Sequence, residues 1–196
     1  MWGRMQRALN FLPLGASDLE THPAFNVVIA YEDFETGNQA KRTYDCLTRN
    51  LGREYRLTNQ MWKFDILSIP KLREIAGNDA AGADIVIVSC RGDELPEHVK
   101  AWMESWLPQG ENVLALVGLF ASRDPARRRN ARVFLADLAR RGKMQFFTNA
   151  EDPDAPLGPE ESSALGSLPA RRDRTFTTLA GVMQRDLGIP RWGINE

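Results

Sequence analysis

The chain has 196 residues, 43% of them hydrophobic, and a formal net charge of -1 at pH 7. This length and composition predict one good-sized domain with extensions, in preference to two small domains. The near-zero charge argues against a nucleic-acid-binding protein, and no apolar run approaches the roughly 20 residues that a transmembrane helix needs. Two cysteines without metal-ligand spacing exclude a disulfide framework and favour a reducing, cytoplasmic location.

The first predicted strand follows an N-terminal extension, residues 1–25. Val27–Ala30 is a short continuous apolar run, which is typical of a central parallel strand covered by helices on both faces. A polar and acidic turn, Tyr31–Gly37, comes next. Helical spacing of apolar residues then predicts a helix over Gln39–Asn50, with Gly52 placed to end it.

The second strand and the second helix are predicted between residues 53 and 82. Arg53–Leu57 enters the strand, and Asn59–Leu67 is too apolar for a free loop, so we expect it to form the strand's end and a buried connection. Pro70 suits the first turn of the helix, where its missing N–H is harmless. The predicted core face of this helix comprises Leu72, Ile75, Ala76 and Ala80.

Three more strands and two more helices are predicted further along the chain. The strands are Asp84–Ser89, Asn112–Phe120 and Met144–Phe147. Pro96 begins a helix with an apolar stripe that we expect to pack in the core, because a large aromatic face is what covers a sheet. The stripe comprises Val99, Trp102, Met103 and Trp106. Ser122 or Asp124 caps the second of these two helices, whose arginines are expected to face solvent. The residues placed inward or nearly so are Val133, Phe134, Ala136 and Leu138.

Five strands alternating with four helices predict an α/β fold over residues 26–149. Right-handed crossovers then give a three-layer, doubly wound, five-stranded parallel sheet with the order 2-1-3-4-5. Residues 150–196 are predicted to form a linker rich in Pro, Gly, Ser and charge, followed by a helix and a tail. The tail carries Trp192 and Ile194, which dock either on the domain or on a partner protein.

The turns after the first and third strands form the predicted ligand-binding edge, because ligands bind at the switch point of such sheets. Glu32 and Asp33 follow the first strand, and Asp93 follows the third. Carboxylate oxygens suit a hard cation, so these three residues, which Glu94 could join, are the candidate Mg²⁺ site. Solvated loop carboxylates are the preferred explanation.

The segment Val27–Leu51 resembles the first strand and helix of response-regulator receiver domains. In that family, acidic residues after the first strand hold Mg²⁺, and Glu32 and Asp33 stand at that place. A receiver carries its phosphate-accepting Asp at the end of the third strand, where this chain has Ser89 and Cys90, and it carries a Lys after the fifth strand, which this chain lacks. The resemblance implies a receiver-like module without phosphotransfer.

The same turn also resembles a flavodoxin phosphate-binding loop, whose Thr-Gly-Asn core is matched by Thr36, Gly37 and Asn38. The segment SCRGDELPEHVKAW, which contains Arg91 and Gly92, resembles a Gly-Asp-Gly-Glu-Leu-Pro segment of flavodoxin-like domains. These resemblances imply the flavodoxin-like fold. They also imply an alternative function, an FMN- or nucleotide-binding redox protein with these five residues at the cofactor.

Other candidate residues have ordinary explanations. Trp62 and Phe120 are candidates for stacking on a flavin, and core packing is the preferred explanation for each. Cys90 is expected to be a half-buried structural cysteine, because the cysteine-phosphatase loop would need Arg at the position of Pro96. His98 is placed on the outer face of its helix. No catalytic residue is assigned.

The preferred function is therefore a non-catalytic, receiver-like signalling or protein-binding module. A protein partner is expected, through the acidic edge or through the tail, and a homodimer is left open. Nucleic acid is not an expected partner.

Overall fold

The computed structural model describes residues 23–53, 55–92, 94–149 and 181. Along the described residues five strands alternate with four α-helices, and short 3-10 helices follow β2 and α3. The strands are β1 (Ala24–Tyr31), β2 (Arg56–Lys63), β3 (Ile85–Cys90), β4 (Ala115–Phe120) and β5 (Gln145–Thr148). The helices are α1 (Phe34–Leu51), η1 (Phe64–Ser68), α2 (Pro70–Ala81), α3 (Glu97–Trp106), η2 (Leu107–Gln109) and α4 (Pro125–Arg141).

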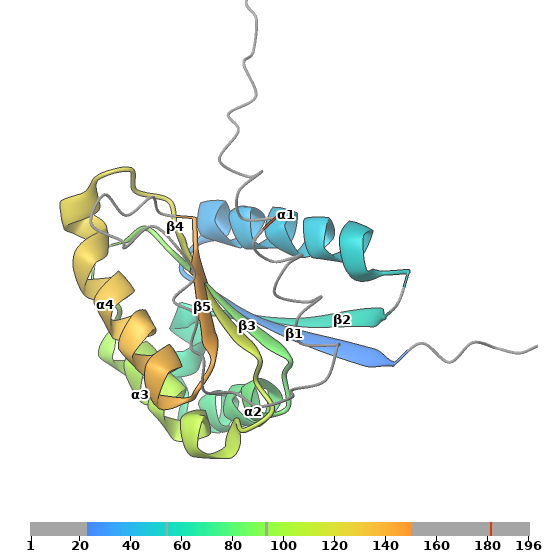
Figure 1. The fold of residues 1–196 in the computed structure, drawn as a ribbon. Helices are drawn as coiled ribbons and strands as arrows, with labels where there is room; N and C mark the ends of the chain where they lie inside the picture. The colour runs from blue at the N-terminus through green and yellow to red at the C-terminus, as the bar shows by residue number, and fades with distance from the viewer. Residues whose placement is uncertain (1–22, 54, 93, 150–180, 182–196) are drawn as a thin grey trace, which may run out of the picture.

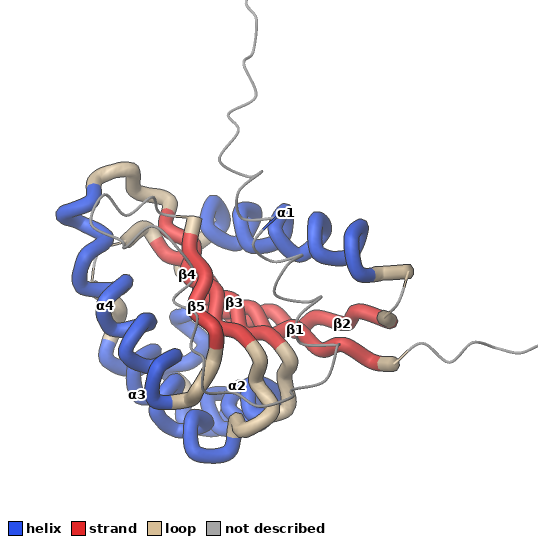
Figure 2. The backbone as a smooth tube through the Cα atoms, viewed as in Figure 1, coloured by secondary structure: helices blue, strands red, loops and turns tan. Residues whose placement is uncertain are grey.

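The sheet has the order β2-β1-β3-β4-β5, and each neighbouring pair of strands is parallel. Figure 1 shows α1 on one face of the sheet and α2, α3 and α4 on the other, and Figure 2 shows the strands as one twisted layer between them. The predicted α/β class, strand order and layering are confirmed. β1 and β3 are adjacent, so the turns that follow them lie at one edge.

The hydrophobic core is divided by the sheet into two clusters. All six residues of β3 are buried, and successive side chains alternate between the two faces. Val86 and Val88 pack on the side of α2, α3 and α4, whereas Ile85 and Ile87 pack on the side of α1. This explains the continuous apolar run, because a parallel strand with both faces covered needs apolar side chains throughout.

The residues predicted to face the core are all buried in α3, but only some of them are buried in α2 and α4. The four predicted residues of α3 are all buried, as expected. Ile75 of α2 is instead 41% exposed, and Val133 of α4 is 59% exposed. In α2 the buried stripe consists of Ala76, Gly77 and Ala80. Small residues are favoured there because α3 lies close, and a Cβ atom at Gly77 would be 3.4 Å from Ser105 Oγ.

Several element boundaries differ from the predictions, and those of α1 and β2 differ in ways that matter for the site. α1 begins at Phe34, five residues before the predicted start, because Asp33 caps the helix. β2 continues to Lys63 along the edge of the sheet, where Met61 remains 39% exposed and is not part of a buried connection. The buried connection is the shorter segment η1.

The described elements run from Ala24, where β1 begins, to Thr148, where β5 ends, and the predicted domain bounds of 26–149 stay a prediction. Apart from Gly181, the predicted linker, helix and tail of residues 150–196 lie outside the described residues. Across the described ranges, none of the helices has the length and apolar character required to cross a membrane.

Candidate functional site

The turn between β1 and α1 is a capping box. Thr36 N donates to Asp33 Oδ1 at 3.0 Å, and Asp33 N donates to Thr36 Oγ1 at 2.8 Å. Gly37 N donates to Asp33 O at 2.8 Å, and a Cβ atom at position 37 would lie 2.9 Å from Tyr31 Cδ2. Thr36 and Gly37 are therefore buried parts of the helix start, while Asn38 is exposed.

Arg91 binds the acidic residues of this turn from the end of β3. Its Nε donates to Asp33 Oδ2 at 2.6 Å, and its guanidinium lies 3.4 Å from Glu35 Oε2. Its backbone N donates to Glu32 Oε2 at 2.7 Å. The structure thus brings Glu32, Asp33 and Arg91 together, as the predicted strand order requires. Sequence analysis did not foresee that the cation among these carboxylates would be the chain's own guanidinium.

The charges of this cluster stabilise one another. The hydrogen bond from the Thr36 backbone lowers the pKa of Asp33, and the Arg91 side chain lowers it further. The Asp33 carboxylate in turn raises the pKa of Arg91. Both residues therefore stay ionised around neutral pH, as one bridged ion pair between the turns after β1 and β3.

Replacing Asp33 with asparagine should make folding less sensitive to acid. Asparagine is as good an N-cap, but it lacks a carboxyl whose folded pKa lies below its unfolded value of about 3.9. That carboxyl stabilises the fold above about pH 4, and its contribution is lost as the pH falls through the folded pKa. In urea unfolding between pH 7 and pH 3, the wild type should lose more stability than Asp33→Asn.

The exposed Asp45, which pairs with Lys41 on the same helix, provides the control for this experiment. Asp45→Asn should change stability by no more than about 0.5 kcal/mol, as expected of an exposed pair one turn apart. A constant difference between wild type and Asp33→Asn across the pH range would contradict the role assigned to Asp33.

The end of β3 is buried on both faces of the sheet. Ser89 is fully buried, and its Oγ donates to Thr36 O at 2.8 Å. Cys90 is 2% exposed on the opposite face, so it is more deeply buried than the half-buried residue expected from sequence. Where a receiver domain carries its phosphate acceptor, this chain has a hydroxyl bonded to the start of α1 and a core cysteine.

Gly92 allows α4 to approach the turn after β3. It has a φ of 113° and is buried, and a Cβ atom there would lie 3.0 Å from Arg128 Cγ. A side chain would be strained by the backbone and would also displace the Arg128 stem. Asp93 lies outside the described residues. Glu94 pairs with Lys100 at 2.9 Å, which lowers the pKa of its carboxyl.

The remaining candidates from the sequence have structural partners. Asn149, after β5, accepts from Phe120 N at 2.8 Å and donates to Phe120 O at 3.1 Å, and this ties β5 to β4. Phe120 is 3% exposed, and Trp62 is half-buried with its indole N–H donating to Asp79. His98 is also half-buried, 3.0 Å from Phe64 O, and so does not lie on the outer face that was predicted.

A cavity of about 200 Å³ opens beside Arg91 at this edge. It is lined by Glu35, Arg91, Ala121, Ser122 and Arg127, which come from the ends of β3 and β4 and the starts of α1 and α4. Arg127 was expected to be one of several solvated arginines. The signal that could have identified it is the run of arginines at the start of α4, with no acidic residue in the first turn.

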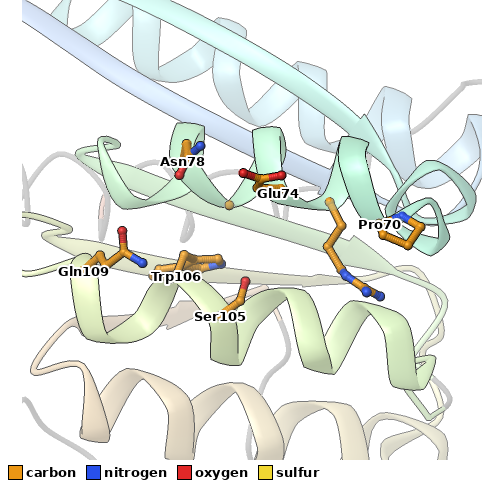
Figure 3. Close-up of a pocket in the computed structure, with 8 residues that line it drawn as sticks. Pro70, Glu74, Asn78, Ser105, Trp106 and Gln109 are labelled. Carbon is orange, nitrogen blue, oxygen red and sulfur yellow. The ribbon is translucent and has the colours of Figure 1, made fainter.

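A second cavity, of about 240 Å³, lies between α2 and α3. Figure 3 shows Glu74 and Asn78 of α2 on one side of it and Ser105 and Trp106 of α3 on the other. The indole N–H of Trp106 is buried and has no partner among the described residues. None of the residues predicted to bind a ligand lines this groove.

The start of α1 does not fit the phosphate of FMN. Thr36 and Gly37 already use their N–H groups within the cap, and the carboxylates of Glu32, Asp33 and Glu35 place negative charge at the helix start. A phosphate needs free donors and a positive potential there. The assignment of Asn38, Arg91 and Gly92 to a cofactor remains a prediction.

The carboxylates suit Mg²⁺ by their chemistry, but a guanidinium already binds them. Among the described residues, no three His, Cys, Asp or Glu side chains are grouped so as to hold a metal ion. The predicted site of Glu32, Asp33 and Asp93 includes one residue outside the described ranges and remains a prediction. Trp192 and Ile194, predicted to contact a partner, also lie outside them.

No protein-family model matches this sequence. No curated protein matches it either. Solved structures do resemble it. One is rubredoxin oxygen:oxidoreductase from the anaerobe Desulfovibrio gigas, at 13% identity and a TM-score of 0.43, covering 84% of this chain and 37% of that one. Another is an oxidoreductase from Corynebacterium diphtheriae, at 11% identity and a TM-score of 0.46, covering 83% of this chain and 96% of that one. The chain thus spans little more than a third of the Desulfovibrio protein. Its own strand order and layering identify its fold as the flavodoxin-like α/β fold.

Proposed function

We propose that this chain is a receiver-like protein-binding module that works without phosphoryl transfer and without a bound metal. The observation that carries the proposal is the Arg91 guanidinium, which binds the carboxylates that would otherwise hold a cation. The buried hydrogen bond of Ser89 at the expected phosphoacceptor position supports it. Asn149 supports it too, because it joins two strands where a receiver would carry a lysine.

The Arg91 guanidinium supplies to the acidic turn the positive charge that Mg²⁺ would otherwise supply, and it belongs to the chain itself. Mg²⁺ demands near-octahedral oxygen ligands and is reluctant to lose its water. To bind Asp33 it would have to break the Arg91–Asp33 contact of 2.6 Å, the shorter of the two carboxylate contacts of Arg91. The edge of the sheet is thereby held in one state and offers a constant surface to a partner.

Removing Arg91 should therefore create a metal response that the wild-type protein lacks. In thermal unfolding with MgCl₂, the wild-type midpoint should stay constant, whereas Arg91→Ala should begin lower and rise with added Mg²⁺. The rise follows because Glu32, Asp33 and Glu35 then repel one another and a cation relieves that repulsion. Arg42→Ala, an exposed change on α1, should behave like wild type.

Three results would overturn this proposal. The first is a wild-type unfolding midpoint that rises with Mg²⁺, and the second is a wild-type chain that acetyl phosphate modifies covalently, as judged by intact mass. The third is a yellow preparation that retains FMN through gel filtration, which would favour the alternative redox function. A colourless protein that ignores Mg²⁺, acetyl phosphate and FMN is the expected result.

The tail residues Trp192 and Ile194 remain the second proposed contact with a partner. If they bind it, a Trp192→Ala and Ile194→Ala double variant should lose that partner while keeping the unfolding midpoint of the wild type. Homodimer formation is tested in the same preparation by sedimentation velocity. The cytoplasmic location remains a prediction that fractionation of the source cells would check.

A further inference from the structure

The start of α4 carries a group of arginines that have no ionic partner among the described residues. Within the described part of the chain, none of Arg123, Arg127, Arg128 and Arg129 forms an ion pair. At the other end of α4 the arginines do pair, with Asp137 and Glu104. The two ends of α4 therefore differ, because the arginines at its C-terminal end form ion pairs and those at its N-terminal end do not do so among the described residues.

These arginines lie at the wrong end of the helix for stability. A helix N-terminus carries partial positive charge, so nearby cations are unfavourable and nearby anions are favourable. Asp124 caps α4 by accepting from Ala126 N at 2.9 Å, but the first turn contains no acidic residue. Natural sequences break such local rules mainly at functional sites. An anionic ligand would relieve both the helix dipole and the repulsion among the arginines.

The structure also holds two of these arginines at the edge that carries the candidate site. Arg127 lines the cavity of about 200 Å³ together with Arg91 and Ser122. The Arg128 stem packs over Gly92, whose lack of a side chain permits the contact. Arg91 is already neutralised by Asp33 and Glu35, so the uncompensated charge lies on the α4 side of the cavity.

We propose that this arginine-rich edge, defined as Ser122, Arg123, Arg127, Arg128 and Arg129, binds a carboxylate-rich segment of a partner protein. The inference rests on the proposed protein-binding function and names the chemistry of its partner. Guanidinium groups bind carboxylates in bidentate fashion. The cavity has room for one carboxylate of the partner beside the Ser122 hydroxyl.

Charge distribution favours an acidic peptide over nucleic acid. Glu32, Asp33 and Glu35 lie on the α1 side of the same edge, and a long polyphosphate backbone crossing the cavity would meet them. The whole chain has a net charge of -1, whereas nucleic-acid-binding domains are usually strongly basic. A short acidic segment needs only the α4 side.

The test is binding of a fluorescein-labelled octaglutamate peptide to the full chain, measured by fluorescence anisotropy. Wild type should bind at low ionic strength and more weakly at about 0.15 M salt, where the Debye length is about 8 Å. The double variant Arg127→Glu and Arg128→Glu should lose about tenfold or more in affinity. Its unfolding midpoint should nevertheless rise, because glutamate suits a helix N-terminus. A merely structural role for these arginines would lower the midpoint.

The matched control is the double variant Arg42→Glu and Arg53→Glu. Both arginines are exposed and belong to α1 or the turn after it, on the other face of the sheet, and the change in net charge is the same. The control should bind octaglutamate like wild type. An equal loss of binding in the control would overturn the proposal, because the attraction would then be due to net charge alone.

Other occupants are separate outcomes, and each would overturn the proposal. If octaglutamate does not bind to the wild-type chain, an acidic partner segment is excluded. If single-stranded DNA of the same total charge binds more tightly than octaglutamate, the ligand is a nucleic acid. If inorganic phosphate displaces octaglutamate at the same concentration of negative charge, the edge is a small-anion site. Tenfold tighter octaglutamate binding after neutralising Glu151, Asp152 and Asp154 would identify the chain's own acidic segment as occupant.

This experiment and the Mg²⁺ experiment fail independently. If octaglutamate does not bind and Mg²⁺ leaves wild type unchanged, the chemistry assigned to the partner is wrong and the metal-free module stands. If octaglutamate binds through Arg127 and Arg128 while Mg²⁺ stabilises wild type, the edge binds anions but the proposed metal-free state is wrong.

Discussion

Replacing Ser89 with aspartate, which would restore the carboxylate of a receiver domain, should destabilise this fold by about 3–5 kcal/mol at neutral pH. Ser89 is fully buried, and its Oγ donates to the Thr36 carbonyl at 2.8 Å. An ionised carboxylate can only accept hydrogen bonds, so it could not donate to that carbonyl oxygen, and burial would penalise its charge. Position 89 therefore suits a small side chain that donates a hydrogen bond.

The penalty for Ser89→Asp should depend on pH. Burial would raise the pKa of the introduced carboxyl above its unfolded value, and the protonated form can donate to Thr36 O. The variant should therefore be closest to wild type in stability below about pH 4 and lose stability as the pH rises through the folded pKa. Urea unfolding across this range measures the effect.

Ser89→Ala is the control for this substitution, because it removes the hydrogen bond without adding charge. It should cost about 1 kcal/mol and show no additional pH dependence. A Ser89→Asp chain as stable as wild type at neutral pH would contradict the packing described here. Its modification by acetyl phosphate would also show that the scaffold keeps a phosphoryl-transfer site.

Truncating Trp102 to alanine should cost about 3–5 kcal/mol, the usual range for a large aromatic side chain removed from a core. Trp102 is fully buried, and its ring lies 6.1 Å from that of Trp106 at an interplanar angle of 59°. It packs in the cluster that joins the sheet to α2, α3 and α4. Urea unfolding followed by circular dichroism gives the free energy.

Trp102→Phe separates packing from hydrogen bonding at the same position. The indole N–H of Trp102 is buried and has no partner among the described residues, so losing it should cost nothing. Phenylalanine keeps an aromatic ring, and the loss of stability should be clearly smaller than for alanine. Equal losses for the two variants would contradict the view that aromatic volume is what Trp102 contributes.

These two positions illustrate where sequence was sufficient and where it was not. The Trp102 stripe could be predicted from helical spacing, because a helix that covers a sheet must bury one face. Ser89 could be placed at the end of a strand, but its partner could not be predicted. Thr36 lies 53 residues away, and its carbonyl meets the hydroxyl only once α1 packs across β3.

The start of α1 shows how one sequence pattern can be explained in two ways, and its role at a cofactor stays a prediction. Thr36, Gly37 and Asn38 match a phosphate-binding loop in sequence, yet they belong to the first turns of a helix. Asp33 and Thr36 form a capping box whose hydrogen bonds use the donors that a phosphate would need. Loop motifs and helix caps draw on the same small polar residues, so their letters alone do not distinguish them.

By itself, the sequence determined the class, the layering and the strand order of this fold. Apolar periodicity is a local property, and right-handed crossovers between parallel strands leave few topologies to choose from. The charge pattern of the edge was decided by tertiary structure alone. Arg91 and Asp33 are 58 positions apart, and only the adjacency of β1 and β3 brings the guanidinium to the Asp33 carboxylate. The contact of the Arg128 stem with Gly92 likewise depends on how α4 packs over the turn after β3, which the composition does not determine.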